Sequence, residues 1–304
     1  MRALLVVNPK ATTTSVRARD VLAHALASEV KLDVVETTHR NHAIELARQA
    51  VHDGLDVVVA LGGDGTVNEV VNGLLTDGPQ EGLPALGVVP AGSTNVFARA
   101  LGLPNNPVEA TSQLLEALIE DRRRTIGLGL ADDRYFTFNA GMGLDAGAVR
   151  RVEAARAKGK TATQPLYVRS AVKQHFFGGK HELTVSFEDG SEPLRLALAL
   201  ISSADPWTYL GNRPVRPCPD ASFETGLDLF GLTSAPTAAV LRHLAQLLAK
   251  DSRPHGKRVV LLHDLPGFTL TGDGPLPFQL DGDEIGDREQ IVLKSVPGAL
   301  EVLL

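Results

Sequence analysis

Short apolar runs alternate with helical patterns over the first third of the chain, and this alternation limits the fold more than any other feature. Two of the runs are apolar almost throughout, as expected for strands buried on both faces of a parallel sheet. Between the runs, apolar residues recur at three- and four-residue spacing, which indicates helices packed on that sheet. The predicted strands are Ala3–Val7, Leu32–Glu36, Leu55–Leu61 and Ala85–Val89, and the longer predicted helices are Ser15–Ser28, Asn41–His52 and Val108–Asp121.

After about residue 126 the pattern changes to a series of strands, with helical patterns only near Ala146–Ala157 and Thr237–Ala249. A series of this kind favours an antiparallel β-sandwich. The predicted strands are Tyr135–Phe138, Leu183–Phe187, Leu194–Ser202, Leu227–Leu232, Arg258–Leu262, Gly267–Thr271, Phe278–Leu280 and Ile291–Leu293. We therefore expect a Rossmann-like α/β domain over residues 1–126 and a β-sandwich domain over residues 127–294, since a chain of 304 residues is long enough for two cores.

Composition excludes several classes of protein. The formal net charge of −6 argues against nucleic-acid binding, which usually depends on a positive surface. No apolar run approaches the length of a membrane-spanning helix, and Ala3–Val7 is too short for a signal-peptide core. The single cysteine, Cys218, cannot form an intramolecular disulfide. We therefore expect a cytoplasmic protein without a transmembrane segment, and the sequence leaves the oligomeric state open, a homodimer included.

The most specific motif is Leu61-Gly62-Gly63-Asp64-Gly65-Thr66, between a buried strand and a helix predicted to begin near Val67. Glycines let the backbone adopt positive φ and approach a ligand closely. Backbone N–H groups at a helix start are a binding site for phosphate oxygens. The motif is neither a Walker A loop nor a dinucleotide-binding loop. It predicts a phosphate site, with a capping box between Thr66 and Glu69 as the structural alternative.

A second loop, Pro90-Ala91-Gly92-Ser93-Thr94-Asn95, follows the next strand and leads into a helix at Val96–Ala100. The carboxyl ends of neighbouring parallel strands lie at one edge of a sheet, where open α/β folds bind ligands. We therefore expect both loops to contribute to one nucleotide site, although such a loop on its own is more often a helix cap.

These motifs resemble the catalytic domain of diacylglycerol and sphingosine kinases. The resemblance is carried by Asn8-Pro9, by the first glycine loop with Asn68-Glu69 and Asn72-Gly73, and by Gly92-Ser93-x-Asn95-x-Phe97-Ala98-Arg99 in the second loop. Phe138-Asn139-Ala140-Gly141-x-Gly143-Leu144-Asp145 and Asp281-Gly282-Asp283 are similar to the family's downstream motifs.

The resemblance implies a nucleotide-binding α/β domain, a β-sandwich lipid-binding domain, an active site in the cleft between them, and a return of residues 295–304 to the first domain. It also implies ATP with Mg²⁺ and transfer of the γ-phosphoryl group to a lipid hydroxyl, diacylglycerol or a related lipid. By similarity, the nucleotide contacts are Asn8, Gly62, Gly63, Gly65, Thr66, Gly92, Ser93, Thr94 and Asn95.

Phosphoryl transfer also needs carboxylates, which bind the metal ion and accept the proton of the attacking hydroxyl. We predict catalytic roles for Asp64, Asp281 and Asp283, and metal binding by Asp145 and Asp281. The sequence does not divide base and metal roles among these groups. The alternatives are a turn or helix cap at Asp145 and Asp283, and a hairpin turn at Asp281-Gly282.

Three positions depart from the family's pattern. Val96 stands where many bacterial members have Asp. Asp283-Glu284 stands where the family usually has a single Glu after Asp-Gly, so the carboxylate at this place is either on a shorter side chain, that of Asp283, or one residue later, on Glu284. Glu224-Thr225-Gly226 replaces a common Asp-Gly, which argues against an accessory metal site there.

A basic segment from Arg150 to Lys180 interrupts this acidic chain. We expect Arg150, Arg151, Lys158 and Lys160 to dock a peripheral lipid kinase on anionic headgroups, with a solvated helix face as the alternative.

Two other functions remain open. An NAD kinase shares the Gly-Gly-Asp-Gly-Thr loop, and a non-catalytic lipid- or nucleotide-binding homologue would explain the departures at Val96 and Asp283. His39 and His42 have no third metal ligand in the sequence pattern, which favours a surface or capping role. Trp207 and Tyr209 could line a lipid pocket or fill the core.

Overall fold

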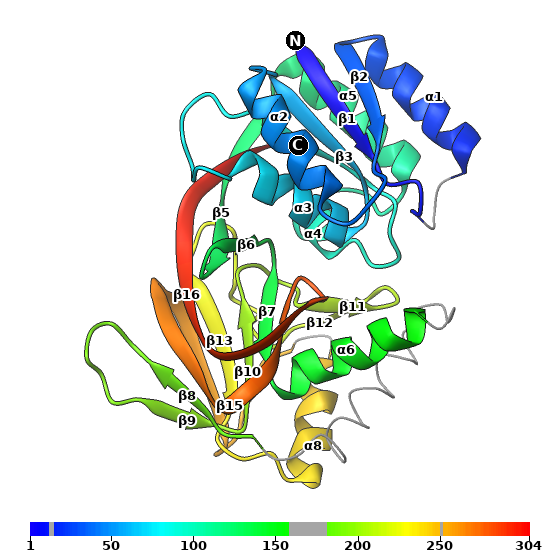
Figure 1. The fold of residues 1–304 in the computed structure, drawn as a ribbon. Helices are drawn as coiled ribbons and strands as arrows, with labels where there is room; N and C mark the ends of the chain where they lie inside the picture. The colour runs from blue at the N-terminus through cyan, green and yellow to red at the C-terminus, as the bar shows by residue number, and fades with distance from the viewer. Residues whose placement is uncertain (12–14, 158–180, 250–251) are drawn as a thin grey trace. The chain divides into compact units, whose positions relative to one another are not determined.

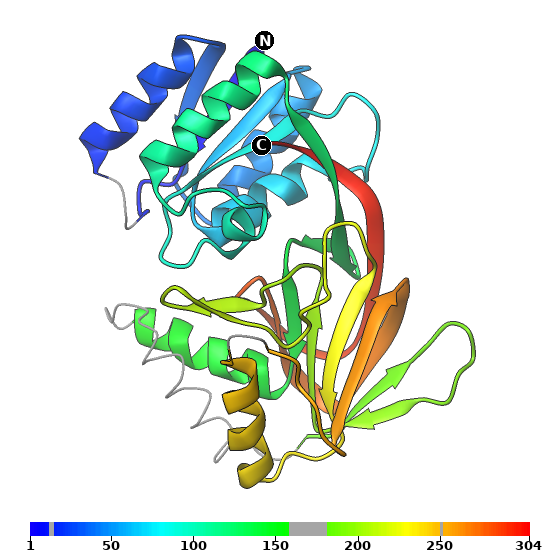
Figure 2. The same cartoon turned by 180° about the vertical axis from the view of Figure 1, so that it is seen from behind.

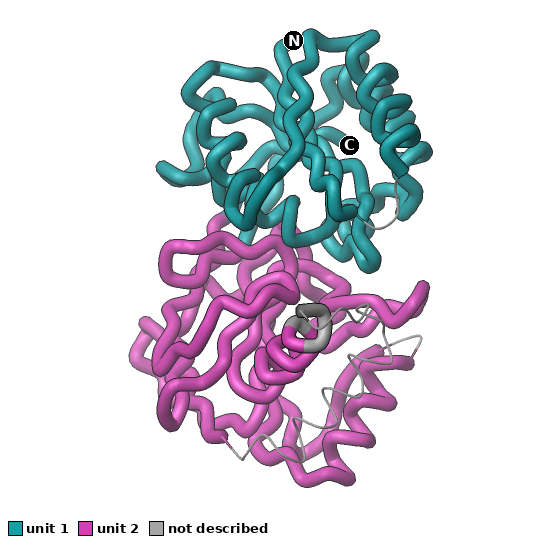
Figure 3. Tube along the Cα trace, turned by 45° about the vertical axis from the view of Figure 1, so that its right-hand side comes forward, with its two compact units in different colours: residues 1–128, 297–304 teal, residues 129–296 magenta. Residues whose placement is uncertain are grey.

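The computed structural model describes residues 1–11, 15–157, 181–249 and 252–304. The chain divides into two compact units, of which the first comprises Met1–Leu128 with Pro297–Leu304 and the second comprises Gly129–Val296 (Figure 3). Each unit has its own hydrophobic core.

A parallel sheet forms the centre of the first unit, with the strand order β16-β4-β3-β1-β2. Every residue of β3 and β4 is buried, because helices cover both faces of these central strands. The edge strand β2 is partly exposed. The strands are β1 (Arg2–Val7), β2 (Lys31–Glu36), β3 (Val57–Gly62), β4 (Ala85–Pro90) and the end of β16 (Asp283–Leu303). Strand β5 (Arg123–Ala131) leads from the first unit into the second.

Helices cover the two faces of this sheet in pairs. α2 and α3 pack on each other in front of the sheet in Figure 1, and α1 and α5 pack together on the opposite face, which is turned toward the viewer in Figure 2. The short helix α4 follows β4. The helices are α1 (Val16–Ala27), α2 (His42–His52), α3 (Asp64–Leu74), α4 (Val96–Ala100) and α5 (Pro107–Glu120).

The second unit is built mainly from antiparallel strands, in the order β14-β13-β10-β7-β15-β16. Strand β8 pairs with β15 and with β9, β6 pairs with β5, and β11 and β12 form a separate hairpin. The strands are β6 (Arg134–Phe136), β7 (Asn139–Met142), β8 (Leu183–Ser186), β9 (Leu194–Leu196), β10 (Leu198–Ser202), β11 (Thr208–Leu210), β12 (Arg213–Val215), β13 (Leu227–Leu232), β14 (Val259–Leu265) and β15 (Gly267–Leu280). Two helices, α6 (Leu144–Ala157) and α8 (Thr237–Leu247), complete the described part of the unit.

The long strand β15 belongs to two parts of the sheet. Its residues 269–272 pair with β8, whereas its residues 278–280 pair with β7. Side chains from both parts enter one core, which includes Phe268, Phe278 and Phe136. The predicted fold class, an α/β unit followed by a strand-rich antiparallel unit, is confirmed.

Several boundaries differ from the predicted ones. Helix α3 begins at Asp64 rather than near Val67, so Gly65 and Thr66 lie in its first turn. The predicted strand Leu194–Ser202 is divided into β9 and β10, while Gly267–Thr271 and Phe278–Leu280 are parts of the single strand β15. Strands β5, β7, β11 and β12 were not predicted.

Candidate functional site

The two glycine loops lie side by side in the first unit, because they follow neighbouring strands of the parallel sheet. Leu61 of β3 pairs with Val89 of β4, and Gly62 pairs with Pro90. One residue further on, the Ala91 N–H donates a hydrogen bond of 2.7 Å to the Gly62 carbonyl. The predicted pairing of the loops is therefore present in this unit.

The glycines permit close packing of the loops rather than unusual backbone angles. A Cβ atom on Gly92 would lie 2.6 Å from Gly63 Cα, and one on Gly62 would lie 2.5 Å from Thr66 Oγ1. Both distances are too short for any side chain. The glycines of the two motifs, Gly62, Gly63, Gly65 and Gly92, lie outside the positive-φ region. These glycines therefore do not use the positive φ that glycine permits, and Gly63 and Gly92 instead allow the close approach of two backbones.

Asn8 and Thr66 join the end of β1 to the start of α3. The Asn8 Nδ2 atom donates a hydrogen bond of 3.0 Å to Thr66 Oγ1, and the Lys10 N–H donates to Asn8 Oδ1 at 2.9 Å. Thr66 is buried. These two predicted nucleotide contacts therefore also hold the first glycine loop in place.

Asp64 is bonded to the second loop's helix. Its Oδ1 atom accepts a hydrogen bond of 3.1 Å from the Phe97 N–H in the first turn of α4. A carboxylate in this position is stabilised by the unpaired N–H groups of the helix start. Asp64 thus positions α4 relative to the first loop, and this contact was not predicted.

Asn95 holds the second loop closed. Its backbone is left-handed, with φ of 51°, and its buried side chain accepts from the Gly92 N–H at 2.8 Å. The amide nitrogen donates to the Gly92 carbonyl at 3.0 Å and to Asn105 Oδ1 at 2.8 Å. Ser93 is exposed and Thr94 is half-buried. Ser93 and Thr94 are therefore the loop's more accessible polar side chains, whereas the Asn95 amide is committed to the loop itself.

The Asn-Glu and Asn-Gly pairs of the first motif attach α2 to α3. Glu69 accepts hydrogen bonds from the N–H groups of Asn41 (2.9 Å) and Ala43 (3.2 Å) at the start of α2. A Cβ atom on Gly73 would collide with the Ile44 carbonyl oxygen, so glycine allows the two helices to approach. The alternative of a capping box between Thr66 and Glu69 is wrong, because Glu69 caps the neighbouring helix.

In the second unit, the Asp281 carboxylate is buried in a ring of donors. Oδ2 accepts from the Thr137 N–H at 2.8 Å and from the Thr137 hydroxyl at 2.9 Å. Oδ1 accepts from the N–H groups of Phe138 (3.0 Å) and Asn139 (3.2 Å). A carboxylate offers about four lone-pair sites, and these donors use that number. The group fixes the strand end that carries Asn139.

Asp281 also forms a tight hairpin turn with Gly282. Leu280 and Asp283 are paired on either side of the turn, and the two central residues have φ values of 50° and 82°. Positive φ at both central positions is the signature of a type I′ turn, which favours Asp-Gly. The structural alternative for this dipeptide is therefore present, together with the buried carboxylate.

Asp145, at the start of α6, belongs to a buried polar network with Gln279 and Asn139. Gln279 Nε2 donates to Asp145 Oδ2 at 2.8 Å and to Asn139 Oδ1 at 3.0 Å. Burial raises the pKa of Asp145 to about 7, and the bond from Gln279 opposes part of that shift. A side chain at Gly141 would collide with the carboxylate, which explains that motif glycine. Strongly shifted carboxyl groups are common at functional sites.

Sequence reasoning missed Gln279 and the polar interior next to it. Ser202 pairs with Asn139 across β10 and β7, and Asn139 Nδ2 donates to the Trp207 carbonyl at 2.8 Å. Near these residues, buried polar atoms without a hydrogen-bond partner gather on Ser202, Ser203, Asp205 and Trp207. Buried polar atoms are rarely left unpaired, so this group indicates bound water or a polar ligand group. Burial raises the pKa of Asp205 to about 6.

A polar residue inside an otherwise apolar strand, as in Phe278-Gln279-Leu280, is the signal that could have identified Gln279. Trp207 itself is half-buried and packs against a small core cluster around Phe230 and Cys218, so it contributes to the core.

The basic docking surface is only partly described. Arg150 Nε lies 2.6 Å from Glu284 Oε1, and its Nη2 atom contacts Asp287, so its charge is used within the second unit. Arg151 is exposed. Lys158 and Lys160 lie outside the described residues. Glu284 could have taken over the role of the family's Glu, but its carboxylate is paired with Arg150. Asp283 is half-buried beside the turn.

Glu45 lies beside His39 and His42, so the expectation that these histidines have no third potential ligand is wrong. The rings of His39 and His42 stack with centroids 4.7 Å apart. However, His42 Nδ1 accepts a hydrogen bond from the Thr38 N–H at 3.1 Å, which leaves the ring's hydrogen on Nε2. That tautomer has no free lone pair for a metal ion.

Among the described residues, no helix is long and apolar enough to cross a membrane.

Comparisons with known proteins agree with this architecture. Residues 2–129 match the model of the diacylglycerol kinase catalytic domain family. A protein of Chromohalobacter salexigens named "Probable lipid kinase YegS-like" is 29% identical over 97% of this chain and 91% of its own length. A diacylglycerol kinase of Bacillus subtilis is 41% identical over 35% of this chain and 33% of its own length.

Solved structures share the fold at lower identity. A diacylglycerol kinase from Bacillus anthracis is similar with a TM-score of 0.73 at 18% identity, and a second structure from that organism with a TM-score of 0.80 at 19% identity. Each comparison covers 99% of this chain and 96% of the other. At these identities the likeness supports the fold alone.

Proposed function

We propose that this chain, as a member of the diacylglycerol kinase and sphingosine kinase superfamily and a phosphotransferase with an alcohol acceptor, transfers the γ-phosphoryl group of ATP to a lipid hydroxyl. The lipid acceptor is supported by relatives named as lipid kinase and diacylglycerol kinase. The observation that carries the proposal is the contact between the two glycine loops, where Gly63 and Gly92 approach too closely for any side chain.

A nucleotide polyphosphate fits the edge of the sheet at which these loops meet. The N-cap of α3 is Gly63, and no side chain caps that helix start, so its N–H groups are available to phosphate oxygens. The exposed Ser93 hydroxyl can add a further donor. Asn8, Thr66 and Asn95 hold the loops in the conformation that presents these donors.

The contacts of the carboxylates suggest how the catalytic roles are divided. Asp281 accepts four hydrogen bonds and Asp64 caps α4, so we assign both to positioning. Asp145 Oδ2 accepts from Gln279, while Oδ1 has no hydrogen-bond partner among the described residues. Its pKa of about 7 suits the acceptance of a proton from an attacking hydroxyl near neutral pH. We therefore propose that Asp145 receives that proton.

The carboxylate oxygens of the second unit also suit Mg²⁺. This ion prefers oxygen ligands and usually binds one or two carboxylates together with substrate phosphates. Asp283 is the carboxylate of the second unit that would hold the ion, because the proposed acceptance of a proton by Asp145 replaces the metal role that was predicted for it. Bound Mg²⁺ would neutralise charge on the transferred phosphoryl group. Asp281 fits less well as a ligand, because its lone pairs are already used within the second unit.

The polar interior beside Asp145 supports an acceptor site in the second unit. Ser202, Ser203 and Trp207 bear buried polar atoms without partners, and a hydroxyl-bearing lipid head could bond to them. Docking on an anionic membrane would then rest on Arg151, Lys158 and Lys160 rather than on Arg150, which is paired with Glu284 and Asp287. Reversing the charge of these three residues should weaken binding to anionic vesicles.

The proposal is tested by supplying labelled ATP and Mg²⁺ with diacylglycerol, sphingosine, ceramide or an undecaprenol-type alcohol in mixed micelles, and with NAD in a parallel reaction. A labelled lipid supports the proposal, whereas labelled NAD favours an NAD kinase. ATP binding without any product favours a non-catalytic homologue. Asp145→Asn should reduce turnover by about 10²- to 10⁴-fold, as expected for loss of a general base. The matched control is Asp133→Asn, an exposed carboxylate of the same unit that should retain full turnover.

A further inference from the structure

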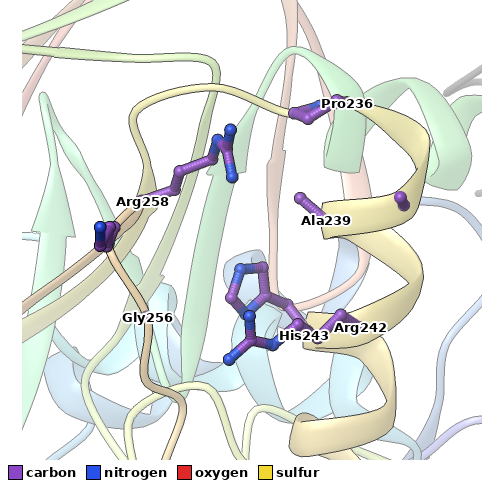
Figure 4. A pocket seen from close by; sticks show the side chains of 8 residues that line it. Pro236, Ala239, Arg242, His243, Gly256 and Arg258 are labelled. Carbon is purple, nitrogen blue, oxygen red and sulfur yellow. The ribbon is translucent and has the colours of Figure 1, made fainter.

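A cavity of about 300 Å³ lies beside helix α8 in the second unit (Figure 4). It is lined by the first turns of α8 and by the residues that lead into β14. None of its lining residues belongs to the network of Asp145, Gln279 and Asn139. The lining residues are Pro236, Ala238, Ala239, Arg242, His243, Gly256, Lys257 and Arg258.

The charge of this lining is entirely positive. Arg242, Lys257 and Arg258 contribute three cationic side chains, and no Asp or Glu lines the cavity. This concentration is notable in a chain with a formal net charge of −6. The side chains of Arg242 and Lys257 are exposed and make no ion pair or hydrogen bond among the described residues. Exposed cations without acidic partners in a concave site favour an anionic ligand.

Two further side chains of the lining, Arg258 and His243, are held in place by hydrogen bonds. Arg258 Nε donates to Ser234 Oγ at 2.9 Å, which holds the guanidinium in place, and Figure 4 shows Arg258, Arg242 and His243 directed into the space between α8 and the β14 side. His243 is only 5% exposed, and its Nδ1 atom lies 2.9 Å from Gln246 Oε1. Since a carbonyl oxygen can only accept, Nδ1 carries the hydrogen, and Nε2 of the neutral ring is an acceptor without a hydrogen-bond partner among the described residues, so the ring is a reporter of the cavity rather than an anion donor.

The start of α8 adds to the positive potential. Its N-cap is Pro236, which provides no capping side chain, and its first turn contains no acidic residue. The positive end of the helix dipole is therefore not neutralised by a side chain of this helix. Ala238 and Ala239, small residues of that turn, line the cavity and leave its N-terminal end accessible to a compact anion.

We propose that this cavity is a second anion site, which binds a phosphate group. The planar guanidinium groups of Arg242 and Arg258 match phosphate oxygens, and Lys257 contributes a flexible third charge. A phosphate group can come from a small phosphorylated molecule or from the headgroup of an acidic phospholipid. The chemistry at the site is the same in both cases.

The probe for the site is inorganic phosphate, added to the complete chain without nucleotide, with the His243 imidazole NMR signals as the local readout. Saturable shifts of those signals are expected. The double variant Arg242→Ala/Lys257→Ala should weaken phosphate binding about 30-fold, from roughly 1 kcal/mol for each cation. Arg195→Ala/Lys294→Ala is the matched control, because it removes the same two charge types from exposed positions elsewhere in the unit.

A second measurement distinguishes the two sources of phosphate. Vesicles of phosphatidylcholine are compared with vesicles that also contain phosphatidic acid. Binding to phosphatidic acid that depends on Arg242 and Lys257 assigns the site to a lipid headgroup, whereas binding of phosphate alone assigns it to a small phosphorylated molecule. The charge-retaining variant Arg242→Lys/Lys257→Arg should recover most of the binding.

The proposal is overturned if phosphate produces no shift at His243, or if the double variant and the matched control bind it equally. Because nucleotide and lipid acceptor are absent from the phosphate experiment, its result is independent of the kinase assay.

Discussion

Gln279 donates a hydrogen bond of 2.8 Å to Asp145 from the same amide nitrogen that donates to Asn139. One nitrogen thus joins the start of α6 to the start of β7, two elements that both carry motif residues. The side-chain oxygen of Gln279, Oε1, accepts a hydrogen bond of 2.9 Å from the Gly282 N–H, which connects the Asp-Gly turn to the same network. The carboxyl group with the strongly raised pKa is therefore oriented by a residue that no motif includes.

The variant Gln279→Met should raise the pKa of Asp145 above about 7, because the bond from Gln279 lowers it. If Asp145 accepts the proton during transfer, the rising limb of the rate against pH moves to higher pH. A pH profile of lipid phosphorylation measures this. A loss of rate with an unmoved limb would contradict the assignment.

The Asp145→Asn variant should change how stability depends on pH. Burial raises the pKa of Asp145 from 3.8 to about 7, so the folded protein binds this proton more tightly than the unfolded chain does. This tighter proton binding adds to the free energy of unfolding, and the contribution is fully present below pH 3.8 and is lost as the pH rises to about 7. Removing the charge should therefore stabilise the protein at pH 8 relative to pH 5 by about 2–3 kcal/mol, because part of the loss already occurs between pH 3.8 and pH 5. Denaturant unfolding at the two pH values checks the difference, and equal differences for variant and parent would refute it.

Gly92→Ala should disrupt the nucleotide site. The added methyl group would lie 2.6 Å from Gly63 Cα, so the loops must separate, at a cost of about 1–3 kcal/mol. Thermal unfolding with and without ATP measures both stability and binding. At the matched control Gly78→Ala the methyl group meets open space but φ is 81°, so a cost of only about 1–2 kcal/mol and unchanged ATP stabilisation are expected.

Asp281→Asn should destabilise the second unit by about 3–5 kcal/mol, because it replaces a buried carboxylate whose lone pairs are all used. The NH₂ group of the new amide would face the backbone N–H groups that donate to Asp281 in the parent. The control Asp133→Asn alters an exposed carboxylate and should be within about 0.5 kcal/mol of the parent. Urea unfolding of both variants is the measurement, and a small effect at Asp281 would show that the ring of donors is not a stabilising feature.

Asp228 raises the pKa of His263, since the carboxylate lies 2.9 Å from His263 Nδ1. Replacement by Asn should return the His263 pKa toward 6.5. The ion pair stabilises the fold below that value and is lost as the pH rises through the folded pKa. An NMR titration of His263 follows the shift, and an unchanged midpoint would remove this pair as its cause.

The periodic elements were predictable, whereas contacts between distant segments were not. The strands and helices of the first unit follow from apolar spacing, but α3 begins earlier than expected because packing overrides the low helix propensity of Gly65. Strand β7 was missed because Asn139–Met142 is short and lacks β-branched residues. Gly272 and Gly274 divide the pattern of β15, so one strand was predicted as two.

The candidate site shows the same division. The resemblance to the superfamily was predicted from motifs, and the family model that matches residues 2–129 and the named relatives support it. The roles of individual carboxylates depend on partners far away in the chain. Asp281 accepts hydrogen bonds from residues about 140 positions earlier, and Asp64 accepts one from a helix start 33 positions later. Neither contact can be predicted from the spacing of residues in the sequence.

Residues 297–304 lie in the first unit, where Val302 of β16 pairs with Leu86 of β4. During synthesis on the ribosome, this sheet therefore stays without its last strand until the entire second unit has been translated. The first unit should remain a partly folded intermediate over that interval, with one flank of β4 unpaired and open to chaperones or to misassociation.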